Sequence, residues 1–196
     1  MFRFTKRFKS DKRGVTAIEF AMLAPVLLLL MLGMFDLGHM AYGHAVLNGA
    51  VQHAARTSSL ETGDTFAADA KVVEITKPIL PSAEYQFERV SYEDFDDVGR
   101  PEAWNDSDGD GTCNNDENFV DENGNGIWDE DIGIDGNGGA GDVVVYKVNV
   151  SYAPVFAVPL LAKAGDLRTI SATTALKRNQ PFAKQNGYGS DAGVCE

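Results

Sequence analysis

The sequence predicts an α+β protein in which a long N-terminal helix precedes a small antiparallel sheet. Three observations predict it. An apolar run fills residues 15–36, and apolar residues continue beyond it at helical spacing to about residue 58. Three runs rich in β-branched and aromatic residues follow, at 84–92, 143–152 and 169–177. Helices first and strands later is the order typical of α+β folds.

The apolar run is long enough to cross a membrane. Phe20 to Phe35 is sixteen residues without a polar side chain, and extension back to Val15 gives 21 residues interrupted only by Thr16 and Glu19. A bilayer core of about 30 Å needs roughly 20 helical residues. We therefore expect a transmembrane helix over residues 15–36.

Charge predicts the orientation of this span. Residues 1–14 hold six Lys or Arg against the single acid Asp11, which leaves 11 basic and 28 acidic residues in the remainder. The positive-inside rule places the N-terminus in the cytoplasm and residues 37–196 on the outer side. The acidic charge of the residues after the leader argues against nucleic acid as a partner and is compatible with metal cations.

Gly14 and Glu19 indicate a more specific role for the predicted span. A carboxylate in a membrane helix is costly and is normally functional. The order of basic leader (1–14), Gly14, four residues, Glu19 and apolar helix resembles the N-terminal signal of the type IV pilin superfamily. That resemblance implies cleavage after Gly14 by prepilin peptidase. Glu19 of one subunit would then pair with the new ammonium group on Val15 of a neighbour, which offsets the burial of both charges.

Two longer strings narrow the resemblance. RGVTAIEFAMLAPVLLLLMLGMFDLG is similar to the start of TadE-like pseudopilins of the tight-adherence (Flp) pilus system, and TTALKRNQPF is similar to their closing strand. This implies a minor pilin-like subunit in the bacterial inner membrane. Its partners would be prepilin peptidase, membrane lipid, other pilin-like subunits and inner-membrane pilus assembly proteins. Val15 and Phe20 depart from the Phe and Tyr usual in classical and Flp major pilins, and Phe20 favours a minor subunit.

Other classes of protein remain open at this stage. The chain could be an unprocessed, membrane-anchored calcium-binding adhesin or surface protein. It could also carry a secretory signal peptide, although the best cleavage sites, near Ala41 to Ala45, come late. We do not expect an enzyme, because the sequence contains no H-E-x-x-H or G-x-S-x-G motif.

Beyond the span, the helix is expected to become amphipathic and to pack on the sheet. The apolar stripe is predicted to comprise Leu37, Met40, Ala41, His44, Leu47, Val51, Ala54 and Ala55. A short second helix is predicted around Thr65 to Ile75. Together with the strands, these elements form the predicted extracytoplasmic domain.

An acidic insertion at 93–142 interrupts the strands. It holds 17 acidic residues and one basic residue, Arg100. Residues 106–117, hereafter the first loop, match the calcium-binding pattern D-x-[DN]-x-[DN]-G-x5-E at every fixed position. Calcium takes six to eight oxygen ligands, and Gly111 at position six allows the sharp turn. The predicted ligands are Asp106, Asp108, Asp110, the carbonyl of Thr112, Asn114 directly or through water, and Glu117.

A second copy of the pattern begins fifteen residues later and is incomplete. Residues 121–132, hereafter the second loop, end on Ile132 in place of the glutamate at position twelve. The predicted ligands are Asp121, Asn123, Asn125, the carbonyl of Ile127, and Asp129 or Asp131 as the closing carboxylate. No room exists for paired helices around either loop, so we expect structural calcium loops without EF-hands.

Two cysteines complete the candidate residues. Cys113 and Cys195 lie far apart in sequence and form no C-x-x-C motif. In an exported domain a disulfide between them is permitted. Two free thiols are an equal alternative.

Overall fold

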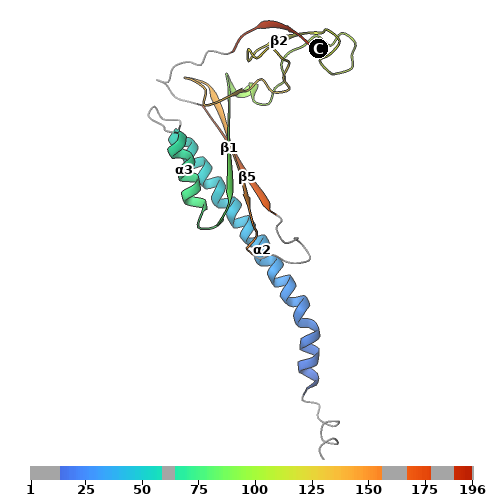
Figure 1. The fold of residues 1–196 in the computed structure, drawn as a ribbon, viewed down its shortest axis with the longest axis vertical. Coiled ribbons are helices and arrows are strands. Elements are labelled where there is room, and N and C mark those ends of the chain that lie inside the picture. The colour runs from blue at the N-terminus through green and yellow to red at the C-terminus, as the bar shows by residue number, and fades with distance from the viewer. Residues whose placement is uncertain (1–13, 59–64, 156–166, 178–187, 196) are drawn as a thin grey trace, which may run out of the picture. The chain divides into compact units, whose positions relative to one another are not determined.

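The computed structural model describes residues 14–58, 65–155, 167–177 and 188–195 (Figure 1). The predicted leader before Gly14 and the end of the TTALKRNQPF string lie outside the described residues. The fold is α+β, as predicted, with helices first and an antiparallel sheet after them. The elements are α2 (Val15–Ser58), α3 (Thr65–Thr76), β1 (Glu84–Tyr92), η1 (Phe95–Asp97), β2 (Asn118–Asp121), β3 (Ile134–Asp135), β4 (Val143–Tyr152), β5 (Arg168–Lys177) and β6 (Asp191–Val194).

The chain divides into two compact units. One comprises residues 1–42 and 153–168, and the other comprises residues 43–152 and 169–196. The 44-residue helix α2 contributes to both units and contains Pro25. Leu, Met and Ala dominate its sequence, and these residues have high helix propensity. The predicted helix is thus confirmed over its full length.

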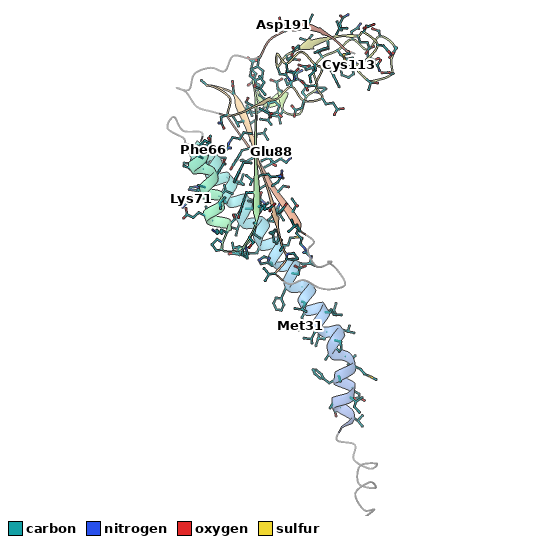
Figure 2. All side chains as sticks on the ribbon, viewed as in Figure 1. Met31, Phe66, Lys71, Glu88, Cys113 and Asp191 are labelled. Carbon is teal, nitrogen blue, oxygen red and sulfur yellow. A yellow bond between two sulfur atoms is a disulfide. The ribbon has the colours of Figure 1, made fainter. Side chains whose placement is uncertain are left out.

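The first unit presents a bare apolar helix. Between Val15 and Phe35 the large apolar side chains are 38% to 75% exposed. Figure 2 shows side chains such as Met31 standing free around this part of α2. Among the described residues, α2 is the one helix long and apolar enough to span a membrane, with a mean hydropathy of 2.3 in its most apolar stretch. Such a surface needs lipid or other helices to cover it.

The first buried side chain along α2 is Asp36, which is 3% exposed. Its carboxylate forms an ion pair with Arg168, at the start of β5. Arg168 Nη1 also lies 3.9 Å from Met40 Sδ. A buried carboxylate requires such a partner, because removal of one charge would leave the other unpaired and buried. Within the first unit, this contact ties Arg168 to α2.

The second unit is built on a four-stranded sheet with the order β3-β1-β4-β5. β1 pairs antiparallel with β4 from Glu84↔Ser151 to Tyr92↔Val143, and it also pairs antiparallel with β3. The three predicted strands therefore form the body of the sheet. β2, which lies in the acidic insertion, pairs with β6 from the C-terminal segment in a separate two-stranded sheet.

The sheet has one apolar and one polar face. Tyr85, Phe87 and Arg89 of β1 lie opposite Val150, Val148 and Tyr146 of β4, and these three β4 residues are at most 3% exposed. On the other face Lys147 forms an ion pair with Glu88 at 3.0 Å. This alternation is typical of a sheet with one solvated face.

Polar contacts from Asp69 and Thr76 join helix α3 to the apolar face of the sheet. Asp69 accepts hydrogen bonds from Arg89 Nη2 and from the Tyr146 hydroxyl, each at 2.5 Å. Burial, and then the hydrogen bond to Asp69, raise the pKa of Tyr146 above its ordinary value. A second contact joins Thr76 Oγ1 to the Tyr85 hydroxyl at 2.8 Å.

The buried stripe of α2 differs in part from the prediction. Leu47, Val51, Ala54 and Ala55 are buried as expected, whereas Leu37, Ala41 and His44 are exposed. The buried face instead includes Gly43 and Ala50. Gly43 explains why the buried face of α2 is shifted from the predicted one. A Cβ at this position would lie 3.1 Å from Leu80 Cδ2 and 3.7 Å from Ile170 Cδ1. The close approach at this glycine sets which side of the helix meets the sheet.

A bulky residue at Gly43 is expected to destabilise the second unit. Gly43→Leu should overpack the contact with Leu80 and Ile170 and cost about 1–3 kcal/mol. Gly49→Ala is the matched control, because a Cβ at that position meets nothing within 4 Å. Its gain in helix propensity should stabilise the protein by about 0.5–1 kcal/mol. Thermal unfolding of the full chain in detergent measures the stability of both variants. Equal effects of the two substitutions would contradict the packing argument.

Candidate metal-binding loops and processing site

The acidic insertion is an ordered structure in this fold. The sequence pattern did not predict η1 or the strands β2, β3 and β6. Gly193 of β6 lies opposite Phe119 of β2, and a Cβ on Gly193 would meet the Phe119 ring at 2.2 Å. The pairing of β2 with β6 therefore requires a glycine at this position.

The first loop is organised by hydrogen bonds from its own backbone amides to its carboxylates. The amides at positions four and six donate to the carboxylate at position one, and those at five and seven donate to positions three and five. Gly109 and Gly111, at positions four and six, have φ of +77° and +79°, a conformation that favours glycine. The bonds are Gly109 N to Asp106 Oδ1 (2.7 Å), Gly111 N to Asp106 Oδ2 (3.1 Å), Asp110 N to Asp108 Oδ1 (3.2 Å) and Thr112 N to Asp110 Oδ1 (2.8 Å).

The twelfth position closes the first loop. Glu117 is 3% exposed, and its Oε1 accepts a hydrogen bond from the amide of Ser107, at position two, at 2.5 Å. One ligand oxygen each from Asp106, Asp108 and Glu117 lie within 4.8 Å of one another. The buried Oδ1 of Asn114, at position nine, has no hydrogen-bond partner. Three converging carboxylates and an unsatisfied oxygen form an oxygen-rich donor set of the kind that calcium prefers.

Asp110 contributes in a different way. Hydrogen bonds from Thr112 and Asn114 lower the pKa of its carboxyl. The Asn114 amide donates to Asp110 Oδ2 at 2.8 Å. Asp110 therefore stays ionised to lower pH than an ordinary aspartate, which favours cation binding.

The second loop repeats the same hydrogen-bond register. Positions four and six again donate to position one, and positions five and seven to positions three and five. Gly124 and Gly126 have φ of +76° and +84°. The bonds are Gly124 N to Asp121 Oδ1 (2.7 Å), Gly126 N to Asp121 Oδ2 (2.8 Å), Asn125 N to Asn123 Oδ1 (3.1 Å) and Ile127 N to Asn125 Oδ1 (2.8 Å).

Of the two predicted closing carboxylates, the structure brings only one into the second loop. Asp129 Oδ2 accepts hydrogen bonds from the side-chain amides of Asn123 and Asn125, at 2.8 and 2.5 Å. Asp131 faces elsewhere, because it accepts from the Tyr92 hydroxyl at 2.8 Å and from the amide of Gly133. Ile132 at position twelve is 2% exposed and packs in a core cluster with Tyr92 and Val143.

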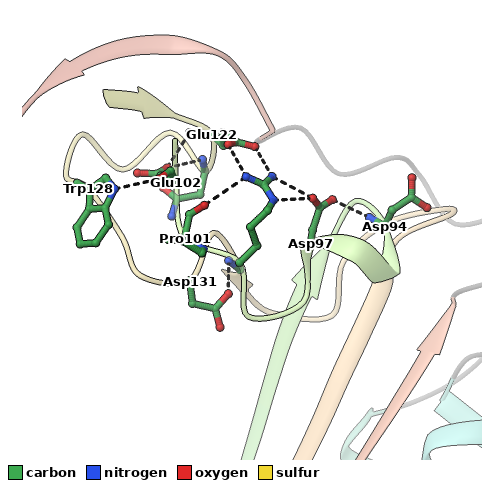
Figure 3. A network of polar contacts seen from close by, with 10 residues as sticks. Asp94, Asp97, Pro101, Glu102, Glu122, Trp128 and Asp131 are labelled. Carbon is green, nitrogen blue, oxygen red and sulfur yellow. Dashed lines mark hydrogen bonds and ion pairs between the residues drawn. The ribbon is translucent and has the colours of Figure 1, made fainter. Parts of the chain in front are cut away.

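Two residues that the pattern did not single out hold the second loop in place. Arg100 donates to both carboxylate oxygens of Glu122, at 2.9 and 2.7 Å, and to Asp97 Oδ1 (Figure 3). Glu102 is completely buried and accepts from the amide of Glu122 at 2.7 Å. Arg100 is the lone base of the insertion, but neither residue belongs to the twelve-residue motif, so spacing within the motif does not identify them.

The two cysteines form a disulfide in the structure, with Cα atoms 5.6 Å apart. Cys113 is position eight of the first loop, and Cys195 follows β6. Beside the disulfide the amide of Cys195 donates to the carbonyl of Glu117 at 2.8 Å. The C-terminal strand is thus bonded covalently and by hydrogen bonds to the end of the first loop. Of the two alternatives that the sequence left open, the structure has the disulfide.

The processing residues lie at the start of α2. Gly14 precedes the helix, and its carbonyl accepts a hydrogen bond from Ile18 N at 3.2 Å. Val15 and Glu19 are exposed on the first turns. Within the described part of the chain, no basic side chain pairs with Glu19. Its carboxylate is therefore available to a group from outside the described residues.

Comparison with known proteins identifies the N-terminal segment. Residues 14–56 match the family model described as TadE-like protein, which confirms the resemblance expected from the sequence. This family is a family of pilus structural components. The match covers nearly all of α2, including the apolar span and the buried stripe, and leaves the sheet and the acidic insertion outside it. Comparisons with curated proteins and with solved structures gave no match.

The Arg100 contacts predict an acid-sensitive contribution to the stability of the insertion. The hydrogen bond from Arg100 lowers the pKa of Glu122 below its ordinary value. The contribution of this pair is therefore full above about pH 4.3, the unfolded pKa, and is lost as pH falls through the lower folded pKa.

Arg100→Met should lower the free energy of unfolding by about 1 kcal/mol at pH 7, a modest amount because the pair is partly exposed. At pH 3 the substitution should lower it much less, because the contribution of the pair is lost as pH falls through the folded pKa of Glu122. Both tryptophans of the chain, Trp104 and Trp128, lie in the insertion with ring centroids 5.0 Å apart, so fluorescence in urea reports this region. Lys71→Met, which removes the exposed Lys71–Glu74 pair of α3, is the control. A pH-independent effect of Arg100→Met would contradict the assignment.

Proposed function

We propose that this protein is a minor pilin-like subunit that assembles into an adhesive pilus of the tight-adherence type. The observation that carries the proposal is the match of residues 14–56 to the TadE-like family. In this proposal prepilin peptidase cleaves after Gly14, and the exposed apolar part of α2 inserts into the inner membrane and packs there against other pilin-like subunits. The second unit lies on the outer side of the membrane.

Two physical features support the insertion of α2. Its apolar side chains from Val15 to Phe35 are largely uncovered, and lipid or neighbouring helices would cover them. Glu19 is the exception in this surface. After cleavage, the ammonium group of Val15 in an adjacent subunit would be the partner that offsets the burial of its charge.

The cysteines support an extracytoplasmic location for the second unit. Cys113 and Cys195 are bonded, and disulfides persist in oxidising compartments such as the periplasm and the cell surface. The disulfide closes a loop across 82 positions of the chain. A link of this length is expected to stabilise the folded insertion by about 4.5 kcal/mol in the chain-entropy description.

The proposal includes structural calcium in the insertion. In the first loop Asp106, Asp108, Asp110, Asn114 and Glu117 would supply side-chain oxygens and Thr112 its carbonyl. The convergence of three carboxylates within 4.8 Å supports a cation there, because like charges so close repel one another without one. A surface-exposed module needs an affinity of only about 10⁻⁴–10⁻³ M, which suits a structural ion.

The maturation step has a direct test. The N-terminus of the protein isolated from membranes should be Val15. Gly14→Leu should leave the leader attached, whereas Gly38→Leu, at an exposed position where a Cβ meets nothing within 4 Å, should not. Mass spectrometry of the intact chain distinguishes the alternatives. A chain that begins at Met1 would identify an unprocessed anchored surface protein, and one that begins near residues 42–46 would identify a secretory signal peptide.

Removal of calcium should open the insertion selectively. With EGTA, endoproteinase Glu-C is expected to cleave at glutamates of the insertion such as Glu102 and Glu117, while Glu84 and Glu88 of β1 stay protected. Fragments must be analysed after reduction, because the disulfide holds them together. Calcium should restore protection, and magnesium should do so much less well since it dehydrates reluctantly. Equal digestion with and without EGTA would exclude a structural ion.

A further inference from the structure

The second loop lacks the residue that normally closes a calcium loop. Position twelve is Ile132, which is buried in the core cluster with Tyr92 and Val143. A glutamate at this position would place its charge among apolar side chains. Apart from Asp129 at position nine, a closing carboxylate must therefore come from outside the second loop.

Glu102 accepts the equivalent hydrogen bond in the second loop. In the first loop the carboxylate of Glu117 accepts a hydrogen bond from the amide at position two, Ser107, at 2.5 Å. In the second loop the carboxylate of Glu102 accepts from the amide at position two, Glu122, at 2.7 Å. Glu102 lies 19 positions before the start of the second loop, outside any twelve-residue window.

Glu102 is buried without a cationic partner among the described residues. Its side chain is 0% exposed. Within the described part of the chain it accepts hydrogen bonds only from backbone amides, those of Glu122, Asn123 (3.4 Å) and Asp129 (3.2 Å), and it has no ion pair. The nearby guanidinium of Arg100 is taken up by Glu122 and Asp97. Buried carboxylates are normally paired with a cation or bound to a metal.

The backbone keeps Glu102 in register with the second loop. Its amide donates to the carbonyl of Asp129 at 3.0 Å, and its carbonyl accepts from Trp128 Nε1 at 3.0 Å. Figure 3 shows Glu102 beside Trp128 and Glu122. The backbone of Glu102 is thus hydrogen-bonded to the second loop through both its amide and its carbonyl.

We infer that Glu102 is the closing carboxylate of a second calcium site, together with Asp121, Asn123, Asn125 and the carbonyl of Ile127. The inference rests on the calcium binding proposed above and adds a ligand that the linear motif does not contain. Since Glu102 precedes the first loop by four residues, one short segment serves both sites. The second site then has two to three carboxylates, fewer than the first, and should bind the weaker of two ions.

Calorimetric titration of calcium into the full chain in detergent tests the inference. The wild type should bind two ions. Glu117→Gln should remove the ion of the first loop, and Glu102→Gln added to it should remove the remaining one or weaken it at least about tenfold. In an Asp121→Asn background, Glu102→Gln should have no further effect. Glu130→Gln is the matched control, because Glu130 is an exposed neighbouring glutamate.

A purely structural role of Glu102 makes a different prediction. If Glu102 had only a structural role, Glu102→Gln would lower the melting temperature equally in calcium and in EGTA. If Glu102 is a ligand, the substitution should mainly reduce the rise in melting temperature that calcium produces. Should Glu102→Gln not fold, Glu102→Asp keeps the charge and draws it back by one methylene, and it should weaken only the second ion.

The outcomes separate this inference from the proposal on which it rests. Two ions with unchanged affinity in Glu102→Gln would overturn the role of Glu102 and leave the first site in place. A wild type that binds a single ion, abolished by Glu117→Gln, would do the same. A wild type that binds none would overturn the calcium proposal and this inference with it.

Discussion

The structure of the insertion depends on how its carboxylates are satisfied. With 17 acidic residues and one basic residue, this region cannot be held together by ion pairs alone. It relies instead on backbone amides that donate to carboxylate and amide oxygens, in the same register in both loops. Each bond satisfies a donor and an acceptor, but none removes negative charge. A divalent cation would complete such an arrangement, since it adds the one component that backbone amides cannot supply.

Helix α2 is exposed along its first part and packed along its second. Up to Phe35 its residues are apolar except for Thr16 and Glu19, and no face is distinguished by burial. From Asp36 onward one face is buried at helical spacing, with Gly43 and Leu47 as its next members. The ion pair of Asp36 with Arg168 lies at this change, so the helix acquires a fixed partner where the bare surface gives way to a packed one.

Much of this fold could be predicted from the sequence because it follows local patterns. The long first helix, the second helix and the strands β1, β4 and β5 obey helical or alternating periodicity, and the structure places them within one residue of their predicted bounds. The side of α2 that is buried was predicted only in part. Apolar spacing suggested Ala41 and His44, but the close approach at Gly43 depends on Leu80, which lies far away in sequence. The strands β2 and β6 were missed for the same reason, because they pair across some seventy residues and neither is long enough to show alternation.

The same limit explains why Glu102 has no signal in the linear motif. A twelve-residue pattern assumes that the chain which begins a loop also closes it. In the second loop the closing position is occupied by Ile132, which ties the loop to Tyr92 and Val143 of the sheet. That contact anchors the insertion to the core, and a glutamate at position twelve would forfeit it. With the closing carboxylate supplied from Glu102, the loop keeps both its apolar anchor and a carboxylate at the amide of position two. The departure from the motif at Ile132 is therefore better understood as a division of roles between two residues than as the decay of a second calcium loop.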